Sequence, residues 1–289
     1  MIRVELQGGL GNQLFIWAMA HRLSEDYKTH IKLIVPWNKL TRDDRPCEIN
    51  ELNRLCKHDI SISESRYFSI LTKFIDKFSS NTFVKKTNLM NTLRIITQKN
   101  TDDISIEMSR TPRVLRGYFQ SNQMVESIKE EILDEISNHL IGLEFPENTL
   151  DSKTNTAVHI RRGDTKAISN EWGILTLDYY ENLIDKGKGT IICTDEIDFS
   201  TDISKKFPNS VIVSSENSSA WQVLKIISNS QVFVMANSTL SWWGAWIAIN
   251  TLNTKVYFPE PWRPNNKKVS DSLKMKSAIS VPAIFESKP

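Results

Sequence analysis

The feature that most constrains the fold is a regular alternation, in the second half of the chain, of short apolar runs with longer amphipathic stretches. The apolar runs predict strands at 156–160, 190–193, 210–213, 231–236 and 255–258. The stretches between them have helical periodicity, at 177–185, 200–207, 220–228 and 239–250. Such alternation is typical of a parallel sheet covered on both faces. We therefore expect an α/β domain whose ligands bind beyond the carboxyl ends of the strands.

The first half predicts a second domain of related type. Its predicted elements are a strand at 2–6, a helix at 12–27, strands at 30–35 and 113–119, and a long helix from Ser121 to 140. Residues 37–110 contain helical patches without clean periodicity, so we assign no elements there. The stretch 142–155 is polar and indicates a linker. We accordingly predict an N-terminal domain at 1–150 and a C-terminal domain at 151–289.

Composition excludes several classes of function. Apolar residues make up 40% of the chain, which is enough for a core, and 36 basic against 34 acidic residues leave a net charge of +2. That balance gives no general attraction to nucleic acid, so any anion site must be built locally. The cysteines Cys47, Cys56 and Cys193 lack the spacing of metal ligands and indicate reduced thiols.

These features predict a cytoplasmic protein. We find no apolar signal region at the start, and the longest apolar stretch, at 240–249, is too short for a membrane span. The segment 73–99 holds many cations and few anions, and could contact the inner face of a bacterial membrane peripherally. A solvated surface is the alternative interpretation of that segment.

Two adjacent arginines, Arg161 and Arg162, directly follow the strand predicted at 156–160. Neighbouring residues of an extended chain point to opposite sides, so one arginine can bind a ligand while the other anchors the loop. Guanidinium groups bind phosphate oxygens through paired, charge-assisted hydrogen bonds, and Asp164 can orient one of them. We predict a phosphate-binding strand end, with an exposed ion-pair cluster as the alternative.

A turn of three polar residues, Asn237, Ser238 and Thr239, separates a predicted strand from a predicted helix. Free N–H groups and the dipole at a helix N-terminus attract anions, and the two hydroxyls add donors. Plain N-capping is an alternative that is compatible with this role. The tryptophans of the following helix are predicted to pack in the core rather than to stack on a sugar.

Asp195 follows the strand predicted at 190–193. A carboxylate placed there can accept hydrogen bonds from N1–H and the exocyclic amine of guanine, a donor pair that adenine and uracil lack. A helix-capping or solvated acid is the alternative. Together with the arginines and the polar turn, this acid predicts a nucleoside diphosphate pocket. Since the sequence contains no Asp-x-Asp triplet, the pocket is predicted to neutralise the diphosphate without metal.

The loop GGLGNQLF follows the first predicted strand. It does not fit the dinucleotide fingerprint, because Leu14 stands at the third glycine position and the second predicted strand ends without an acid. Gly9 and Gly11 still let a ligand approach the backbone, and Asn12 and Gln13 can donate hydrogen bonds to it. We interpret it as a loop of the first domain that faces the nucleotide pocket of the second.

Three of these stretches, GGLGNQLF, HIRRGD and NSTLSWWGAW, resemble in residues and order the signatures of the α-1,2-fucosyltransferases of glycosyltransferase family 11. These enzymes of bacteria and animals transfer L-fucose from GDP-fucose to galactose. GYFQS at 117–121 and LDYY at 177–180 match weaker blocks of the family. The resemblance implies a GT-B fold, with two Rossmann-like domains facing each other across a cleft. It also implies inversion at the transferred carbon, with no metal and no cofactor besides the donor substrate.

The resemblance also implies roles for single residues. Arg161, Ser238 and Thr239 would contact the diphosphate, His159 and Asp195 would lie near the guanine, and Asn12 would face the reacting centre. The remaining candidates for binding GDP-fucose are Gly9, Gly11, Arg162 and Asn237. Asn12, Arg161 and Asp164 form the predicted catalytic group, in which Asp164 is either a general base or the carboxylate that orients an arginine.

We therefore predict an in-line displacement in which the 2-hydroxyl of galactose attacks the anomeric carbon while GDP leaves. The expected partners are GDP-fucose and a galactose-terminated glycan, such as a capsule or O-antigen unit. A fucosyltransferase of another linkage (α-1,6 or O-fucosyl) and a non-catalytic GDP-binding protein are the alternatives. Ile16 and Trp17 stand where many members have Gln-Tyr, and Thr165 where a tyrosine is usual, which bears on the choice of acceptor.

Overall fold

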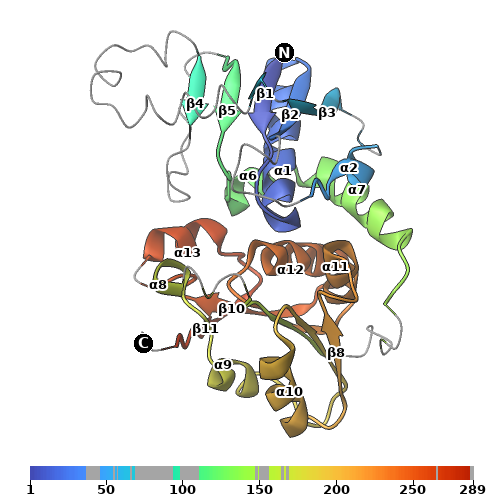
Figure 1. The fold of residues 1–289 in the computed structure, drawn as a ribbon, viewed down its shortest axis with the longest axis vertical. Coiled ribbons are helices and arrows are strands. Elements are labelled where there is room, and N and C mark those ends of the chain that lie inside the picture. Colours follow the sequence, from blue (N-terminus) through green and yellow to red (C-terminus); the bar gives the residue numbers. More distant parts are fainter. Residues whose placement is uncertain are drawn as a thin grey trace. The chain divides into compact units, whose positions relative to one another are not determined.

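The computed structural model describes residues 1–36, 46–54, 56, 58–65, 67–68, 94–97, 111–146, 149, 156–163, 166, 169–264 and 266–286. The chain divides into two compact units, Met1–Ile136 and Ser137–Pro289, and the division falls within helix α7 (Lys129–Ile141). Each unit is built on a parallel sheet with helices (Figure 1). The prediction of an α/β protein with two domains of this type is confirmed.

The first unit contains a sheet of five parallel strands in the order β3-β2-β1-β5-β4. Its elements are β1 (Ile2–Glu5), α1 (Leu10–Tyr27), β2 (Ile31–Pro36), α2 (Asn50–Asn53), β3 (Ile60–Ser65), β4 (Ile95–Thr97), β5 (Val114–Arg116), α6 (Asn122–Glu126) and the start of α7. From β1 the chain moves outward through β2 and β3, and it later returns to the other side of β1. The strand order therefore reverses between β1 and β5.

The long helix predicted from Ser121 to 140 is wrong, because the structure has two helices there, α6 and α7. The predicted cap is confirmed, since Ser121 Oγ accepts a hydrogen bond from the backbone N–H of Met124 at 3.3 Å. The break lies at Ser127, whose hydroxyl donates to the Met124 carbonyl at 2.7 Å and accepts from Arg22 of α1 at 2.7 Å. A serine side chain that bonds to the preceding turn competes with helix continuation.

The second unit contains a sheet of six parallel strands in the order β11-β10-β9-β6-β7-β8. Its elements are β6 (Thr156–Ile160), α8 (Ser169–Trp172), α9 (Leu177–Glu181), β7 (Thr190–Thr194), α10 (Ile197–Lys206), β8 (Ser210–Ser214), α11 (Ala220–Ser228), β9 (Val232–Val234), α12 (Thr239–Leu252), β10 (Lys255–Glu260), α13 (Lys267–Leu273) and β11 (Ile279–Pro282). All five strands predicted from periodicity are present. The edge strand β11 is largely exposed and lacks the apolar run that revealed the others.

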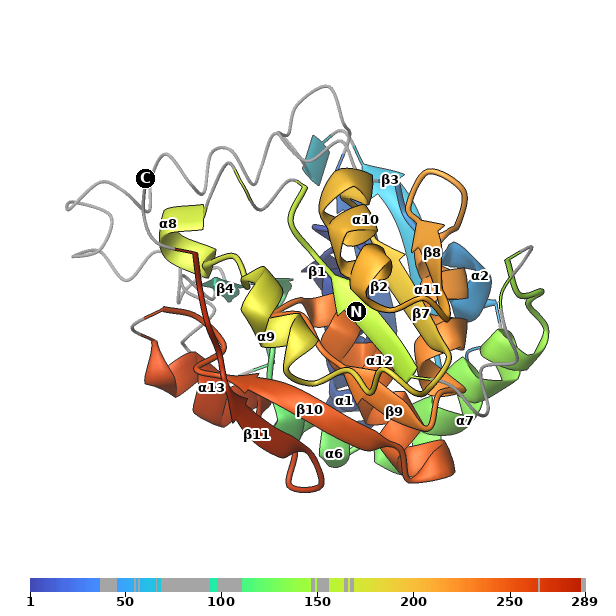
Figure 2. The same ribbon diagram turned by 90° about the horizontal axis from the view of Figure 1, so that it is seen from below.

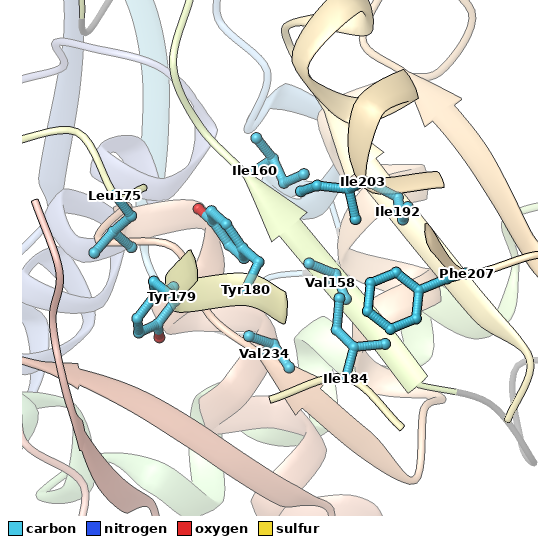
Figure 3. Close-up of a cluster of buried hydrophobic side chains, with 10 residues drawn as sticks. All are labelled: Val158, Ile160, Leu175, Tyr179, Tyr180, Ile184, Ile192, Ile203, Phe207 and Val234. Atoms are coloured by element: carbon cyan, nitrogen blue, oxygen red, sulfur yellow. The ribbon is translucent and has the colours of Figure 1, made fainter. Parts of the chain in front are cut away.

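The two faces of this second sheet have different partners. Val158 and Ile160 of β6 point to one face, where they pack with side chains of α9 and α10 (Figure 3). His159, between them in sequence, points to the other face and contacts Ser241 of α12. Figure 2 shows α9 and α10 on the near side of the strands, with α11 and α12 behind them. His159 is thus the polar member of an otherwise buried apolar strand.

Helix α12 holds the tryptophans in the core, as predicted. Trp242, Trp243 and Trp246 are at most 1% exposed and lie against one another, with ring centroids 5.3–6.4 Å apart. The indole N–H of Trp242 donates to the Leu273 carbonyl at 2.7 Å. Gly244 lets α12 approach α11, because a Cβ there would lie 2.6 Å from the Ile227 side chain. This packing leaves none of these three rings available to stack on a sugar.

Some predictions fall on other parts of the chain. Asp164 and Thr165 lie outside the described residues, as does the cation-rich segment 73–99 apart from residues 94–97. Within the described ranges, we find no helix that combines the length and the apolar character needed to cross a bilayer.

Candidate functional site

The strand order of the second unit reverses between β6 and β9, which are neighbours in the sheet with Val158 opposite Val234. At such a switch point the connections leave in opposite directions, and the space beyond the carboxyl ends of the strands is the usual ligand site of a parallel sheet. Arg161 follows β6 and the turn at Asn237 follows β9. Asp195 follows β7, the next strand along. The topology therefore brings the predicted residues to one edge.

Arg161 is held by the carboxylate of Asp195. Its Nη1 lies 2.8 Å from Asp195 Oδ2, and Oδ1 of the same carboxylate accepts the backbone N–H of Arg162 at 2.8 Å. The loop packs closely here, because a Cβ at Gly163 would lie 3.1 Å from Asp195 Oδ2. Both carboxylate oxygens thus serve the loop after β6. In this arrangement Asp195 orients Arg161.

Arg162 is buried and belongs to a different network. Its Nε donates to Glu196 at 2.7 Å, and its Nη1 contacts the Leu175 carbonyl at 3.2 Å and Glu286 at 2.7 Å. The guanidinium also lies 3.8 Å over the Phe199 ring. Of the two arginines, this one therefore anchors the loop, and it joins β6 to the segment that follows β11.

His159 is buried and contacts Ser241. Ser241 Oγ accepts the backbone N–H of Ala236 at 3.2 Å and lies 2.6 Å from His159 Nδ1. Burial lowers the pKa of His159 to about 4, with Asp195 opposing and Arg161 adding to the effect. The imidazole is therefore neutral at physiological pH.

The start of α12 offers donors that the protein does not use. Ser238 is the N-cap residue with extended backbone (φ −131°, ψ 140°), yet its side chain caps nothing. Its hydroxyl has no partner among the described residues. The first N–H groups of a helix also lack intrahelical acceptors, and Thr239 occupies the first helical position. The half-buried turn therefore presents hydroxyl and amide donors at the sheet edge.

Asn237 has an anchoring contact instead. Its Nδ2 donates to the carbonyls of Trp172 and Gly173, at 2.9 and 3.1 Å. Asn237 is buried, so this side chain joins the turn after β9 to the segment between α8 and α9. It holds the turn in place for Ser238 and Thr239.

The first unit has its own switch point, between β1 and β5, and the glycine loop lies there. Asn12 Oδ1 accepts a hydrogen bond from Gln120 Nε2 at 3.0 Å, which connects the loop after β1 with the segment after β5. Gly8 has φ +75°, and a Cβ there would lie 2.4 Å from Asn12 Nδ2. Gly9 caps α1 with extended backbone, and Gly11 is buried in its first turn. The glycines therefore make room for the amide of Asn12.

The N-terminus of α1 is already occupied by an internal anion. Glu48 Oε2 accepts the backbone N–H of Leu10 at 2.8 Å. Gln13 reinforces the contact, because its Nε2 donates to the Gly8 and Pro46 carbonyls at 2.8 Å each and its Oε1 accepts the Glu48 N–H at 2.9 Å. In a dinucleotide fold the pyrophosphate occupies this position. The contact supports rejection of the dinucleotide interpretation, and it gives Gln13 an anchoring role.

Two residues of the site were not identified from the sequence. Ser241 reaches His159 across 82 positions, and Gln120 reaches Asn12 across 108 positions. Both lie within stretches singled out above, NSTLSWWGAW and GYFQS. The motifs marked these stretches as functional, but only the fold shows which side chains Ser241 and Gln120 contact.

Known proteins that resemble this chain are glycosyltransferases. The family model of glycosyl transferase family 11 matches residues 1–276. The O-antigen biosynthesis glycosyltransferase WbnK of Escherichia coli is 26% identical, with 96% of this chain and 99% of that protein covered. An α-1,2-colitosyltransferase of Escherichia coli is also 26% identical, over 91% of this chain and 92% of that protein. The solved fucosyltransferase NodZ from Bradyrhizobium is similar at 11% identity and a TM-score of 0.48, with 92% and 96% covered.

Proposed function

Since this chain belongs to glycosyl transferase family 11, we propose that it is the glycosyltransferase that moves L-fucose from GDP-β-L-fucose to the 2-hydroxyl of a galactose, with inversion. The acceptor is a galactose-terminated glycan. The name of the relative WbnK, which covers almost the whole chain, favours a unit of a cell-surface polysaccharide.

The observation that carries the proposal is the group of unused or oriented donors at the β6–β9 switch point. Arg161 is held at that edge by Asp195, and the turn at Ser238 presents a hydroxyl and the first N–H groups of α12. A diphosphate bound there would meet a guanidinium, a hydroxyl and the positive end of a helix dipole. These three supply the neutralisation that a metal ion provides in other transferases, so we propose that the reaction is independent of metal.

The same donors act on the leaving group during transfer. The acceptor oxygen forms its bond to the anomeric carbon as the bond from that carbon to the β-phosphate oxygen breaks. Negative charge then grows on the β-phosphate, where Arg161 and the turn at Ser238 stabilise it. The hydroxyl proton leaves to a general base, for which Asp164 is our candidate. We propose that Asn12, oriented by Gln120, positions a hydroxyl of the donor or acceptor.

The nucleotide can be tested directly by calorimetric titration of the chain with GDP, UDP and ADP in EDTA. We expect selective binding of GDP, followed by transfer from GDP-fucose to β-linked galactosides and an α-1,2 linkage in the NMR spectrum of the product. Another linkage would indicate a fucosyltransferase of a different kind. Binding of GDP without any product on a broad acceptor set would favour a non-catalytic protein, and binding that is restored by Mg²⁺ or Mn²⁺ but not by Zn²⁺ would refute the proposed neutralisation.

A second candidate donor comes from the relative named α-1,2-colitosyltransferase. Colitose is L-fucose without its 3-hydroxyl group. A site that hydrogen-bonds this hydroxyl rejects the deoxy sugar strongly, whereas a site without such a contact accepts both sugars. The ratio of kcat/KM for GDP-fucose and GDP-colitose, measured in competition on one acceptor, decides between these donors.

A further inference from the structure

Three side chains with metal-binding atoms meet in the first unit, away from the glycine loop. His21 lies on α1, Cys56 lies between α2 and β3, and Glu135 lies on α7. His21 and Glu135 are buried and Cys56 is half-buried. His21 Nε2 lies 3.3 Å from Cys56 Sγ and 3.6 Å from Glu135 Oε2, and all three donor atoms lie within 4.8 Å of one another.

The two separations from His21 Nε2 match those between ligands of one tetrahedral ion, and Cys56 Sγ and the Glu135 oxygen lie within 4.8 Å of each other. Zinc bonds of about 2.3 Å to sulfur and about 2.0–2.1 Å to nitrogen and oxygen place tetrahedral ligand atoms about 3.3–3.6 Å apart. Thiolate, imidazole and carboxylate together form a donor set of intermediate softness, which suits Zn²⁺ and does not suit Mg²⁺ or Ca²⁺.

The orientation of the histidine agrees with a ligand role. Trp17 packs edge-on against this ring, with centroids 4.1 Å apart, and fixes its plane. The imidazole is thus held in one orientation with Nε2 toward Cys56 and Glu135.

We propose that His21, Cys56 and Glu135 form a site for one Zn²⁺ ion, with water as the fourth ligand. The ion would join three segments, α1, the α2–β3 connection and the part of α7 that belongs to the first unit. His21 lies about 13 Å further along the axis of α1 than Asn12, at 1.5 Å per residue. The site therefore lies apart from Asn12, and the proposal does not depend on the proposed transfer reaction.

The test uses the purified full chain, stripped with a chelator and titrated with Co²⁺ as a spectroscopic probe. We expect one Co²⁺ per chain, a thiolate-to-cobalt charge-transfer band and the intense visible bands of tetrahedral cobalt, all displaced by Zn²⁺. Zn²⁺ should also raise the Tm of the wild type. A folded wild-type chain that gives no thiolate band would overturn the proposal.

Two variants locate the site. Cys56→Ser should abolish the charge-transfer band, and the matched control Cys47→Ser, a half-buried thiol of the same unit, should retain it. His21→Gln should weaken Co²⁺ binding by more than the roughly 10–100-fold that loss of an outer-shell partner costs. Circular dichroism checks the fold of each variant. A band that survives Cys56→Ser, or disappears in Cys47→Ser, would place the metal elsewhere and refute the assignment.

Discussion

Nη1 of Arg161 lies 2.8 Å from Oδ2 of Asp195, and the other oxygen of that carboxylate holds the backbone N–H of Arg162. One acid thus fixes both the guanidinium of Arg161 and the loop that carries it. Arg162, the next residue, points into a buried network instead. Two adjacent arginines therefore have separable roles, and substitution can distinguish them.

Arg161→Ala should lower kcat by about 10²–10³-fold, as expected for loss of a group that stabilises developing charge. Because its side chain is partly exposed, loss of the ion pair with Asp195 should lower the Tm only modestly. Initial rates with GDP-fucose, together with a thermal melt, measure both effects. Arg22→Ala removes a surface arginine of the first unit and should leave kcat unchanged. Near-normal turnover of Arg161→Ala would refute its assignment.

Arg162→Ala should reduce the free energy of unfolding by about 1.5–3 kcal/mol, because the buried guanidinium loses its charge-assisted contacts while Glu196 keeps Lys166. Urea denaturation followed by circular dichroism measures this loss. Lys166→Ala is the matched control, since Lys166 pairs with the same Glu196 from an exposed position and should cost less than about 1 kcal/mol. Equal losses in the two variants would contradict the anchoring role of Arg162.

Asp195→Asn distinguishes two roles of that acid. If Asp195 mainly orients Arg161, the substitution should weaken the binding of GDP, UDP and ADP by a similar factor, of about 10-fold for one charge-assisted contact. If Asp195 hydrogen-bonds the guanine base, only the binding of GDP should weaken. The contacts of both carboxylate oxygens favour the first outcome. Calorimetric titration of the variant with the three nucleotides measures the ratios.

Gln120→Met should lower kcat about 10-fold while the KM for the donor stays nearly constant. The methionine fills a similar volume but cannot donate to Asn12, so the amide loses its fixed orientation. Gln123→Met, on the exposed side of α6, is the matched control and should have wild-type kinetics. A Gln120→Met variant with unchanged kcat would show that Asn12 needs no such partner.

Stability should depend on pH through His159. Its pKa is about 4 in the folded chain against 6.5 when unfolded, so between these values the unfolded state binds more protons. The free energy of unfolding should therefore fall as the pH decreases from 6.5 to about 4, by up to about 1.4 kcal/mol per pH unit for this group. Urea titrations across this range should give a smaller slope for His159→Gln, and an equal slope would contradict the assignment.

Much of the fold follows from local sequence signals. The strands around Val158, Ile192 and Val234 are buried on both faces and read as continuous apolar runs. The predicted cap at Ser121 is present, but the helix breaks at Ser127, whose hydroxyl bonds to the Met124 carbonyl and also accepts from Arg22, 105 positions away. Such a contact between distant positions leaves no periodic trace in the sequence.

Some residues of the candidate site could likewise be identified from the sequence, and others could not. Arg161 and Ser238 could be identified because each lies shortly after the end of a predicted strand, where parallel sheets bind ligands. The anchoring roles of Gln13 and Asn237 could not, since their residue types suit a ligand equally well and only their acceptors decide. The cluster of His21, Cys56 and Glu135 joins three separate segments, so it has no spacing that a motif could record.

Both sheets reverse their strand order beside their first strand. The contact between Glu48 and Leu10 nevertheless makes the two units differ in the charge at the helix start near that point. In the second unit, the first turn of α12 contains no acidic residue. In the first unit, the resident carboxylate would repel a phosphate at the helix start, whereas an uncharged polyol would incur no such penalty. A single acidic side chain thus makes the start of α1 unfavourable for anions.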